Sequence, residues 1–399
     1  MRERVGVGIV GAGFAADLHL SVYRRLAPTV ELIGVTARNA AKAEALARRH
    51  GVRRVFSDVA ALLAEDDIHL VDLCVPNYCH QQFVAQAAQA HKHVVCPKPL
   101  TGYFGEAGTD GQAGRAPRAH MLERALRSAD EMIDAVRRHG VFLMYAENWL
   151  YAPALQKAMR LIKESGGTIF ELRAEESHHG SHTPYSKEWR YAGGGALLRL
   201  GAHPVAALLH LKHWERVCRT GAPITVGSVC AQVGRLTAIE SFRASAHPWV
   251  VRDWDDVEDW GSAVITFSDG ARGVVLASDV SLGGITAVVD IFLSNARIHC
   301  NLSRTNALQA FAPDPAVFGD EYLVEKLETK AGWSLPSVDE EWTLGYVAQL
   351  RDFVESARTG RPPLADGLLG REVLRLIYSA YLSAEEERVI SLDRPRVWD

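Results

Sequence analysis

The apolar positions of the first 150 residues form short runs that alternate with segments of helical composition. The runs are rich in β-branched residues and end at glycine or polar residues, as is typical of buried strands. They lie at 5–10, 30–36, 70–75, 93–96 and 141–145, and the helices predicted between them lie at 15–26, 40–50, 56–63, 80–90 and 119–139. Strands and helices that alternate at this spacing predict a doubly wound parallel sheet with right-handed crossovers.

The second half of the chain predicts a different architecture. A helical region at 146–165 is followed by a series of extended segments. Strands are expected at 168–176, 224–234, 260–267, 271–279, 285–293 and 296–302. The tripeptide Ser268-Asp269-Gly270 between two of them is a hairpin turn signal. We therefore expect an open, mainly antiparallel sheet in an α+β domain, which ends with helices at 345–358 and 368–386.

A glycine pattern follows the first predicted strand directly. Gly11 permits a tight turn, Gly13 lets the backbone approach phosphate oxygens, and small Ala16 lets the helix pack closely on the strand. Because the pattern lies between a strand and a helix, it predicts a binding site for a nicotinamide dinucleotide. The alternative is a glycine-rich strand–turn–helix of an unrelated α/β protein.

The end of the second strand bears on the choice of dinucleotide. This position normally carries an acid that accepts hydrogen bonds from the adenosine ribose of NAD. Here Ala37 and Arg38 take its place. An arginine can pair with a 2′-phosphate, which favours NADP, with NAD as second choice. Arg38 could instead stack on adenine or remain solvated.

Composition and charge exclude several classes of protein. The 399 residues suffice for two or three domains of about 150 residues each. A net charge of −4 and a pI near 6.5 give no reason to expect nucleic acid or an anionic membrane as partner. The chain has no apolar run that approaches the ~20 residues of a membrane span.

The two arginines near the start could suggest a signal peptide, but the apolar stretch behind them is the glycine-punctuated strand itself. Six scattered cysteines without a Cys-x-x-Cys motif indicate reduced thiols in a cytoplasmic protein. Neither a disulfide framework nor a zinc site is expected from them.

Three further motifs make the pattern specific. They are Pro76-Asn77-x-x-His80 after the third long strand, Pro97-Lys98-Pro99 after the fourth, and the glycine-rich segment 193–203, which ends in His203. In this order they resemble the Gfo/Idh/MocA (glucose–fructose oxidoreductase/inositol dehydrogenase) family. The C-terminal pattern of Gln349, Phe353, Gly360 and Pro363 is also similar to that family.

The resemblance implies two domains. Residues 1–146 would form a dinucleotide-binding Rossmann domain, and residues 147–399 a substrate and oligomerisation domain whose C-terminal segment returns toward the first. An open sheet of this kind commonly supports oligomers in the family, so a homo-oligomer, either a dimer or a tetramer, is expected.

A loop insertion at 102–118 is unusual for the family, which enters a helix almost directly after its Lys-Pro. Glycines recur at every third position from 102 to 114. The segment is too short for a collagen-like helix and predicts a long loop. It could be a tolerated surface insertion or a lid beside the active site.

Lys98 is the first candidate catalytic residue. A lysine at the carboxyl end of a parallel strand can donate a hydrogen bond to a substrate oxygen as it changes between hydroxyl and carbonyl. The family usually has Glu-Lys-Pro here, so Pro97 replaces an acid that could orient the lysine. A purely structural, solvent-facing lysine is the alternative.

His203 is the second candidate, as the group that takes the hydroxyl proton when hydride leaves. Arg199 lies four residues earlier, hence on the same helical face, where the family usually has Asp. Arginine only donates hydrogen bonds and is always cationic. It is expected either to bind an anionic or carbonyl-bearing group of the substrate, or to turn away and pair with an acid.

The histidine-rich stretch 175–182 follows a predicted strand end. With His203 it could assemble a metal site, but its spacing matches no established ligand pattern. We favour a loop of hydroxyl-binding side chains at a substrate pocket, and no metal. The acidic run from Asp253 to Asp259 is expected to be a solvated approach to a strand.

These residues and the resemblance together predict an NAD(P)-dependent oxidoreductase acting on a hydroxyl or carbonyl of a sugar, cyclitol or sugar acid. The predicted catalytic residues are Lys98, His203 and Arg199. The predicted cofactor-binding residues are Gly11, Gly13, Phe14, Ala15, Ala37, Arg38, Pro76, Asn77, His80 and Lys98. The predicted substrate-binding residues are Glu147, Asn148, Tyr151, His178, His182, Trp189 and Arg190. The alternatives are a redox-assisted lyase or glycosidase with tightly held NAD, and a non-catalytic dinucleotide sensor.

Overall fold

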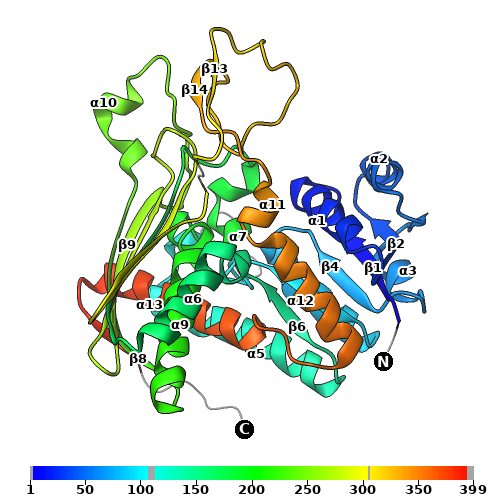
Figure 1. Ribbon diagram of the computed structural model, residues 1–399, viewed down its shortest axis with the longest axis horizontal. Helices are drawn as coiled ribbons and strands as arrows, with labels where there is room; N and C mark the ends of the chain where they lie inside the picture. Colours follow the sequence, from blue (N-terminus) through cyan, green and yellow to red (C-terminus); the bar gives the residue numbers. More distant parts are fainter. Residues whose placement is uncertain (1–2, 107–112, 304–305, 393–399) are drawn as a thin grey trace. The chain divides into compact units, whose positions relative to one another are not determined.

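A computed structural model describes residues 3–106, 113–303 and 306–392 (Figure 1). The chain divides into two compact units. The first unit comprises Met1–Gly102, Glu123–Tyr151 and Gly345–Leu374, and the second comprises Tyr103–Leu122, Ala152–Leu344 and Arg375–Asp399. Segments that are far apart in the sequence therefore build each unit.

The first unit contains a six-stranded parallel sheet with strand order β3-β2-β1-β4-β5-β6. Its strands are β1 (Val5–Val10), β2 (Val30–Thr36), β3 (Arg54–Val55), β4 (Leu70–Leu73), β5 (His93–Pro97) and β6 (Leu143–Ala146). All six residues of β1 are buried, because helices cover both faces of such a sheet. The strand order reverses between β1 and β4, and in sheets of this kind ligands bind beyond the carboxyl ends of the strands at that point.

The helices of this unit begin and end at clear sequence signals. Asn39 caps α2 by accepting a hydrogen bond from the amide of Lys42 at 3.0 Å, and Gly51 ends the same helix in the left-handed conformation. The helices are α1 (Phe14–Arg25), α2 (Ala40–His50), α3 (Val59–Leu63), α4 (His80–Gln89) and α12 (Tyr346–Thr359), while α5 (Arg118–Arg138) and α13 (Gly367–Glu386) contribute residues to both units. Helix α12 packs against α1, although more than 300 residues separate them (Figure 1).

The second unit contains a seven-stranded sheet with strand order β12-β11-β7-β10-β9-β8-β15. The pair β7–β10 is parallel and the other pairs are antiparallel. The strands are β7 (Ile169–Ser177), β8 (Val226–Gly234), β9 (Trp260–Phe267), β10 (Arg272–Ser278), β11 (Thr286–Leu293), β12 (Arg297–Asn301) and β15 (Ile390–Ser391). Burial alternates along β9 and β11, since one face of the sheet packs on helices.

Helices α6 (Pro153–Ser165) and α9 (Ala202–Thr220) pack against this sheet. Four one-turn helices also belong to the unit: α7 (Trp189–Ala192), α8 (Ala196–Arg199), α10 (Glu240–Arg243) and α11 (Glu340–Thr343). A separate hairpin of β13 (Ala310–Ala312) and β14 (Gly332–Ser334) carries long loops (Figure 1).

The predicted fold class is confirmed, with a parallel Rossmann-type sheet and a second, mostly antiparallel sheet. The strands of two or three residues were not predicted, because such short segments have no periodicity to detect. No described helix is long and apolar enough to cross a membrane. All six cysteines are free.

Candidate active site

The glycine turn of the first unit has the geometry that its sequence predicts. Gly11 has φ +123°, and a Cβ there would lie 2.0 Å from the carbonyl oxygen of Cys74. Gly13 is the N-cap of α1 and offers no side-chain cap, and a Cβ on it would meet nothing within 4 Å. The amide groups of the first turn of α1 therefore face an open space, which fits the pyrophosphate of a dinucleotide.

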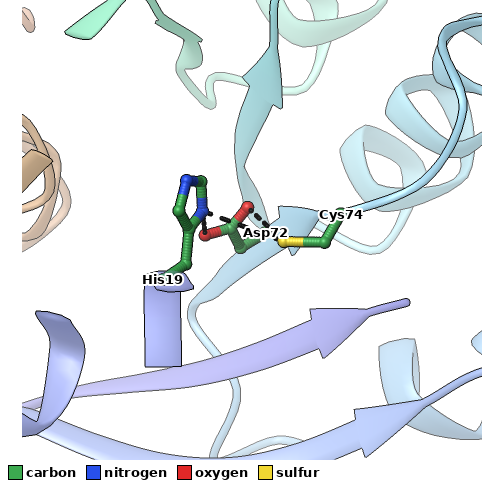
Figure 2. A group of neighbouring side chains, drawn as sticks. All are labelled: His19, Asp72 and Cys74. Carbon is green, nitrogen blue, oxygen red and sulfur yellow. Dashed lines mark hydrogen bonds and ion pairs between the residues drawn. The ribbon is translucent and has the colours of Figure 1, made fainter. Parts of the chain in front are cut away.

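A buried hydrogen-bond cluster of three side chains includes Cys74, whose carbonyl oxygen lies against Gly11 (Figure 2). Asp72, at the end of β4, lies 2.8 Å from His19 Nδ1 and accepts hydrogen bonds from Tyr23 Oη at 3.0 Å and Cys74 Sγ at 3.5 Å. His19, Asp72 and Cys74 could hold a metal ion by proximity. However, burial raises the pKa of the Cys74 thiol well above its ordinary value, so the group remains protonated. The cluster is best explained as a satisfied buried carboxylate that joins α1 to β4.

The predicted adenosine end of the site lies beside this turn. Ala37 is half-buried and Arg38 is exposed at the end of β2. A hollow of about 340 Å³ adjoins the glycine turn, and its walls are Ala12, Gly13, Phe14, Asp17, Lys42, Ala45, Leu46 and Arg49. Both Lys42 and Arg49 are cationic, although Arg49 is paired with Asp17 at 2.9 Å.

His80 joins the loop after β4 to the loop after β5, which contains Lys98. Its Nδ1 lies 3.1 Å from the carbonyl oxygen of Leu100, and its Nε2 lies 3.1 Å from that of Val75. Burial lowers the pKa of His80 while these carbonyls oppose the shift. His80 is 1% exposed, so these contacts hold the loop after β5 in place, and its contact with the cofactor stays a prediction. Lys98 itself is half-buried directly after β5.

Three predicted substrate residues of the first unit are buried next to the returning helix α12. The amide oxygen of Gln349 accepts hydrogen bonds from the backbone amides of Glu147 and Asn148, both at 2.9 Å. The hydroxyl of Tyr151 donates to Asp352 at 2.8 Å. These contacts fix the segment after β6, and a direct contact with substrate stays a prediction.

In the second unit, His203 lies at the start of α9 and faces an acid. Its Nε2 is 3.8 Å from Glu176 Oε2 at the end of β7, and both residues are less than 10% exposed. Among the described residues, Glu176 Oε2 has no hydrogen-bond partner. A buried carboxylate in this position is suited to balance a positive charge on the imidazole. In the sequence, Glu176 is distinguished only as a member of the histidine-rich stretch 175–182.

Arg199 has a different partner. It ends α8, and its guanidinium pairs with the fully buried carboxylate of Asp279, which follows β10. The same guanidinium lies 5.0 Å from the ring centroid of Trp254. Burial raises the pKa of Asp279, and Arg199 opposes that shift. Of the two expectations for Arg199, the structure therefore shows the pairing with an acid.

The histidine-rich loop divides into buried and exposed parts. His178 Nδ1 accepts a hydrogen bond from the amide of Gly180 at 2.9 Å and lies 3.6 Å from Asp279. His179 Nδ1 lies 3.4 Å from Glu328 Oε1, whereas His182 is exposed. Within the described ranges, this loop does not bring three ligand atoms as close as the His19 cluster does.

Trp189 and Arg190 have partners within the second unit. The Trp189 side chain is 1% exposed, with the guanidinium of Arg118 4.2 Å from its ring centroid. Arg190 pairs with Glu188 at 2.6 Å. The Trp189 ring is therefore not an open aromatic surface, and contact of either side chain with substrate stays a prediction.

The prediction that the acidic run 253–259 is solvated is wrong for its last two members. Glu258 is buried and accepts hydrogen bonds from the amides of Gly195 at 3.0 Å and Leu197 at 2.9 Å, and from Tyr381 Oη at 2.7 Å. Asp259 is fully buried as well. A Cβ on Gly195 would lie 1.9 Å from the Glu258 carbonyl oxygen, which explains a glycine there. Glu258 thus positions the segment that carries Arg199 and His203.

The insertion 102–118 could be a surface loop or a lid, and its middle part, residues 107–112, lies outside the described residues. The amide of Tyr103 donates to Tyr378 Oη at 2.7 Å, and the amide of Gly114 donates to Asp256 at 3.1 Å. Both ends are therefore bound to other parts of the second unit.

Comparison with known proteins agrees with the motifs. Residues 5–109 match the family model described as oxidoreductase family, NAD-binding Rossmann fold, and residues 155–299 match the Gfo/Idh/MocA C-terminal domain. Levoglucosan dehydrogenase of Pseudarthrobacter phenanthrenivorans is 27% identical over 387 residues, which cover 92% of this chain and 93% of that protein.

Solved structures with the same fold cover nearly the whole chain. GenD2 from gentamicin A biosynthesis, in complex with NAD, has a TM-score of 0.79 and 27% identity, and the match covers 98% of this chain and 97% of that one. Levoglucosan dehydrogenase in complex with NADH and L-sorbose has a TM-score of 0.72 and 22% identity, and covers 99% of this chain and 100% of that one.

Proposed function

Because the chain belongs to the Gfo/Idh/MocA oxidoreductase family, we propose that it is a dehydrogenase of a sugar or cyclitol that uses a nicotinamide dinucleotide. The observation that carries the proposal is the buried pair of His203 and Glu176. The chain also keeps the lysine of the family's Lys-Pro motif, as Lys98. Relatives of this chain are named levoglucosan dehydrogenase and myo-inositol 2-dehydrogenase. Hydroxyl-rich rings are therefore the substrate class that we propose.

His203 accepts the proton of the reacting hydroxyl in this proposal. The bound dinucleotide supplies the acceptor for hydride from the same carbon. The carboxylate of Glu176 then stabilises the imidazolium that forms, because opposite charges at close range favour the charged form. Lys98, the other acid/base candidate of the family pattern, donates a hydrogen bond to a substrate oxygen in this proposal.

Arg199 decides which charge the substrate can carry. A substrate carboxylate would share the guanidinium with Asp279, which already balances its charge. We propose that Arg199 donates to a neutral carbonyl or hydroxyl oxygen, so that neutral sugars and cyclitols are better substrates than sugar acids.

NADP is the proposed cofactor, with NAD as second choice. The absence of an acid at Ala37 and the exposed Arg38 support this choice. The open N-terminus of α1 supports a pyrophosphate for either dinucleotide. The ratio of kcat/KM for the two cofactors tests the preference.

A homo-oligomer is proposed through the face of the seven-stranded sheet that the helices leave uncovered. Phe170 on β7 is 59% exposed and Val264 on β9 is 44% exposed. Exposed apolar side chains in such a face are typical of a subunit interface. Light scattering coupled to gel filtration distinguishes a dimer or tetramer from a monomer.

The function is tested by incubating the protein with levoglucosan, myo-inositol, xylose and glucuronate, each with NADP and with NAD, while the absorbance of reduced nicotinamide is followed. Net reduction with a neutral substrate is the expected result. Product formed with only catalytic amounts of dinucleotide would instead show a redox-assisted lyase or glycosidase. Dinucleotide binding without any product would show a sensor.

A further inference from the structure

A second cavity lies in the second unit, between the segment that leads into β11 and the chain from Val324 to Glu340, which includes β14. Its volume is about 450 Å³, which is within the range of small-molecule sites. Gly283, Gly284 and Ile285 form one wall. The other walls include Glu325, Glu328, Glu340 and Trp333, and the polar side chains of Ser303 and Gln309. The mechanism proposed above uses none of these residues.

The charged residues that line the cavity are acidic. Three of its lining residues are glutamates, and none of the described residues that line it is basic. Burial alone would raise the pKa of Glu328, but the amides of Gly283 and Gly284 and the neighbouring His179 hold it below the ordinary value. Glu328 is therefore ionised at neutral pH. A ligand that bears a protonated amine would complement this site.

The remaining walls suit a saccharide ring. Trp333 on β14 is 75% exposed, and its ring lies 5.5 Å from that of Phe311 on β13, which holds it in place. An exposed aromatic face provides apolar contact for the C–H face of a sugar. Hydroxyl and amide side chains on the opposite walls can bond its hydroxyl groups.

Two connections join the cavity to the candidate active site within the same unit. Glu328 Oε1 accepts hydrogen bonds from the amides of Gly283 and Gly284 at 2.7 and 3.1 Å, and lies 3.4 Å from His179 in the histidine-rich loop. Two residues beyond Ile285, Ala287 on β11 pairs in register with Glu176, the partner of His203. That is about 7 Å along an extended strand. The cavity wall at Ile285 and the strand pair that carries Glu176 are therefore near neighbours in the same unit.

We infer that this cavity is a subsite for an aminated sugar or aminocyclitol ring, so that the substrate is an aminated saccharide of two or more rings. The inference rests on the proposed sugar dehydrogenase function, because it assumes that another ring of the same molecule reacts at His203. Glu328 pairs with the ammonium group, and Trp333 packs on the ring that carries it.

Isothermal titration calorimetry on the full chain at neutral pH tests the subsite without any need for turnover. The aminated probes are the β-1,4-linked glucosamine disaccharide and kanamycin A, and the neutral probes are cellobiose and maltotriose. We expect at least one aminated probe to bind about tenfold more tightly than both neutral probes, and this preference to weaken at high salt. Equal binding of all four probes, or no binding of either aminated probe, would overturn the inference.

Matched variants assign the effect to the cavity. Glu328→Gln keeps an oxygen that can accept from Gly283 and Gly284 but removes the charge, and is expected to abolish the preference for amines. Trp333→Ala is expected to weaken all saccharide binding. Trp342→Ala and Glu321→Gln alter exposed residues outside the cavity and are expected to bind as the unchanged protein does. If Glu328→Gln retained the preference, the charge would lie elsewhere and the inference would fail.

The subsite and the proposed function fail in different ways. Net reduction of dinucleotide by a neutral monosaccharide, together with equal binding of all four probes, would leave the dehydrogenase and remove the subsite. Preferential binding of the aminated probes, without reduction of the dinucleotide by any sugar, would support the subsite and remove the dehydrogenase.

Discussion

His203 Nε2 and Glu176 Oε2 lie 3.8 Å apart, and both side chains are buried in the second unit. In the family pattern an aspartate four residues before the histidine would be the orienting acid, and here that position is Arg199. The acid that faces the histidine comes from β7 instead.

Glu176→Gln tests whether this carboxylate positions and stabilises His203. Loss of the charge is expected to lower kcat by about tenfold to a hundredfold with little change in KM, because the carboxylate stabilises a charge that forms only during reaction. Steady-state kinetics across a range of pH measure both parameters.

Glu175→Gln, at the neighbouring half-buried position of β7, is the control and should retain full activity. Glu176→Asp should restore part of kcat. Equal losses of kcat in the Gln variants at 175 and 176 would indicate a general effect on the strand.

Arg199→Met is expected to destabilise the protein by about 3–5 kcal/mol, because Asp279 then remains buried without its cation. Burial already raises the pKa of Asp279, and removing Arg199 removes a group that opposes this shift. A carboxyl group with a raised folded-state pKa loses stability as pH rises from its unfolded pKa through its folded pKa. Urea unfolding of the variant should show that loss in this window, above the ordinary range of an aspartate.

The double variant Arg199→Met/Asp279→Asn provides the control, because position 279 then carries no carboxyl group to ionise. It should recover much of the stability and lose the added pH dependence. A double variant as unstable and as pH-dependent as Arg199→Met would show that the pair is not the cause.

Gly11→Ala is expected to abolish dinucleotide binding. The left-handed backbone would cost of order 1–3 kcal/mol, and the new Cβ would also lie 2.0 Å from the Cys74 carbonyl oxygen. Gly51→Ala is the matched control, since it has φ +70° but open space around its Cβ position. It should lose only about 1–2 kcal/mol of stability and still bind the dinucleotide, as measured by fluorescence titration with NADPH.

Arg38→Asp is expected to raise KM for NADP by about tenfold or more and to leave or improve KM for NAD, because the new acid repels a 2′-phosphate and can accept from a ribose hydroxyl. The kcat/KM ratio for the two cofactors is the measurement. An unchanged ratio would place Arg38 outside the adenosine site.

The motifs that are local in sequence were predictable, and the groups that meet only through folding were not. Gly11 is identified by its place between a strand and a helix, and Lys98 and His203 by short patterns. Glu176 lies at the end of β7, and Asp279 follows β10, its parallel neighbour in the sheet. About 100 residues separate the two acids in the sequence, so their contacts with His203 and Arg199 cannot be read from a local pattern.

Glu258 shows a second reason for failure. Its acidic neighbours predict a solvated run, yet the backbone amides of Gly195 and Leu197 and the Tyr381 hydroxyl donate hydrogen bonds to the buried carboxylate. The hydrogen-bond partners of a charged residue decide whether it can be buried, and they come from distant parts of the chain.

The most direct measurement of the proposed function is transfer of deuterium from a sugar or cyclitol, labelled at its hydroxyl-bearing carbons, to the nicotinamide, followed by mass spectrometry. The intact protein should give singly deuterated reduced dinucleotide. His203→Asn should bind the dinucleotide equally well but form this product at least about a hundredfold more slowly. Unlabelled reduced dinucleotide, or an undiminished rate in His203→Asn, would contradict a hydride transfer in which His203 accepts the hydroxyl proton.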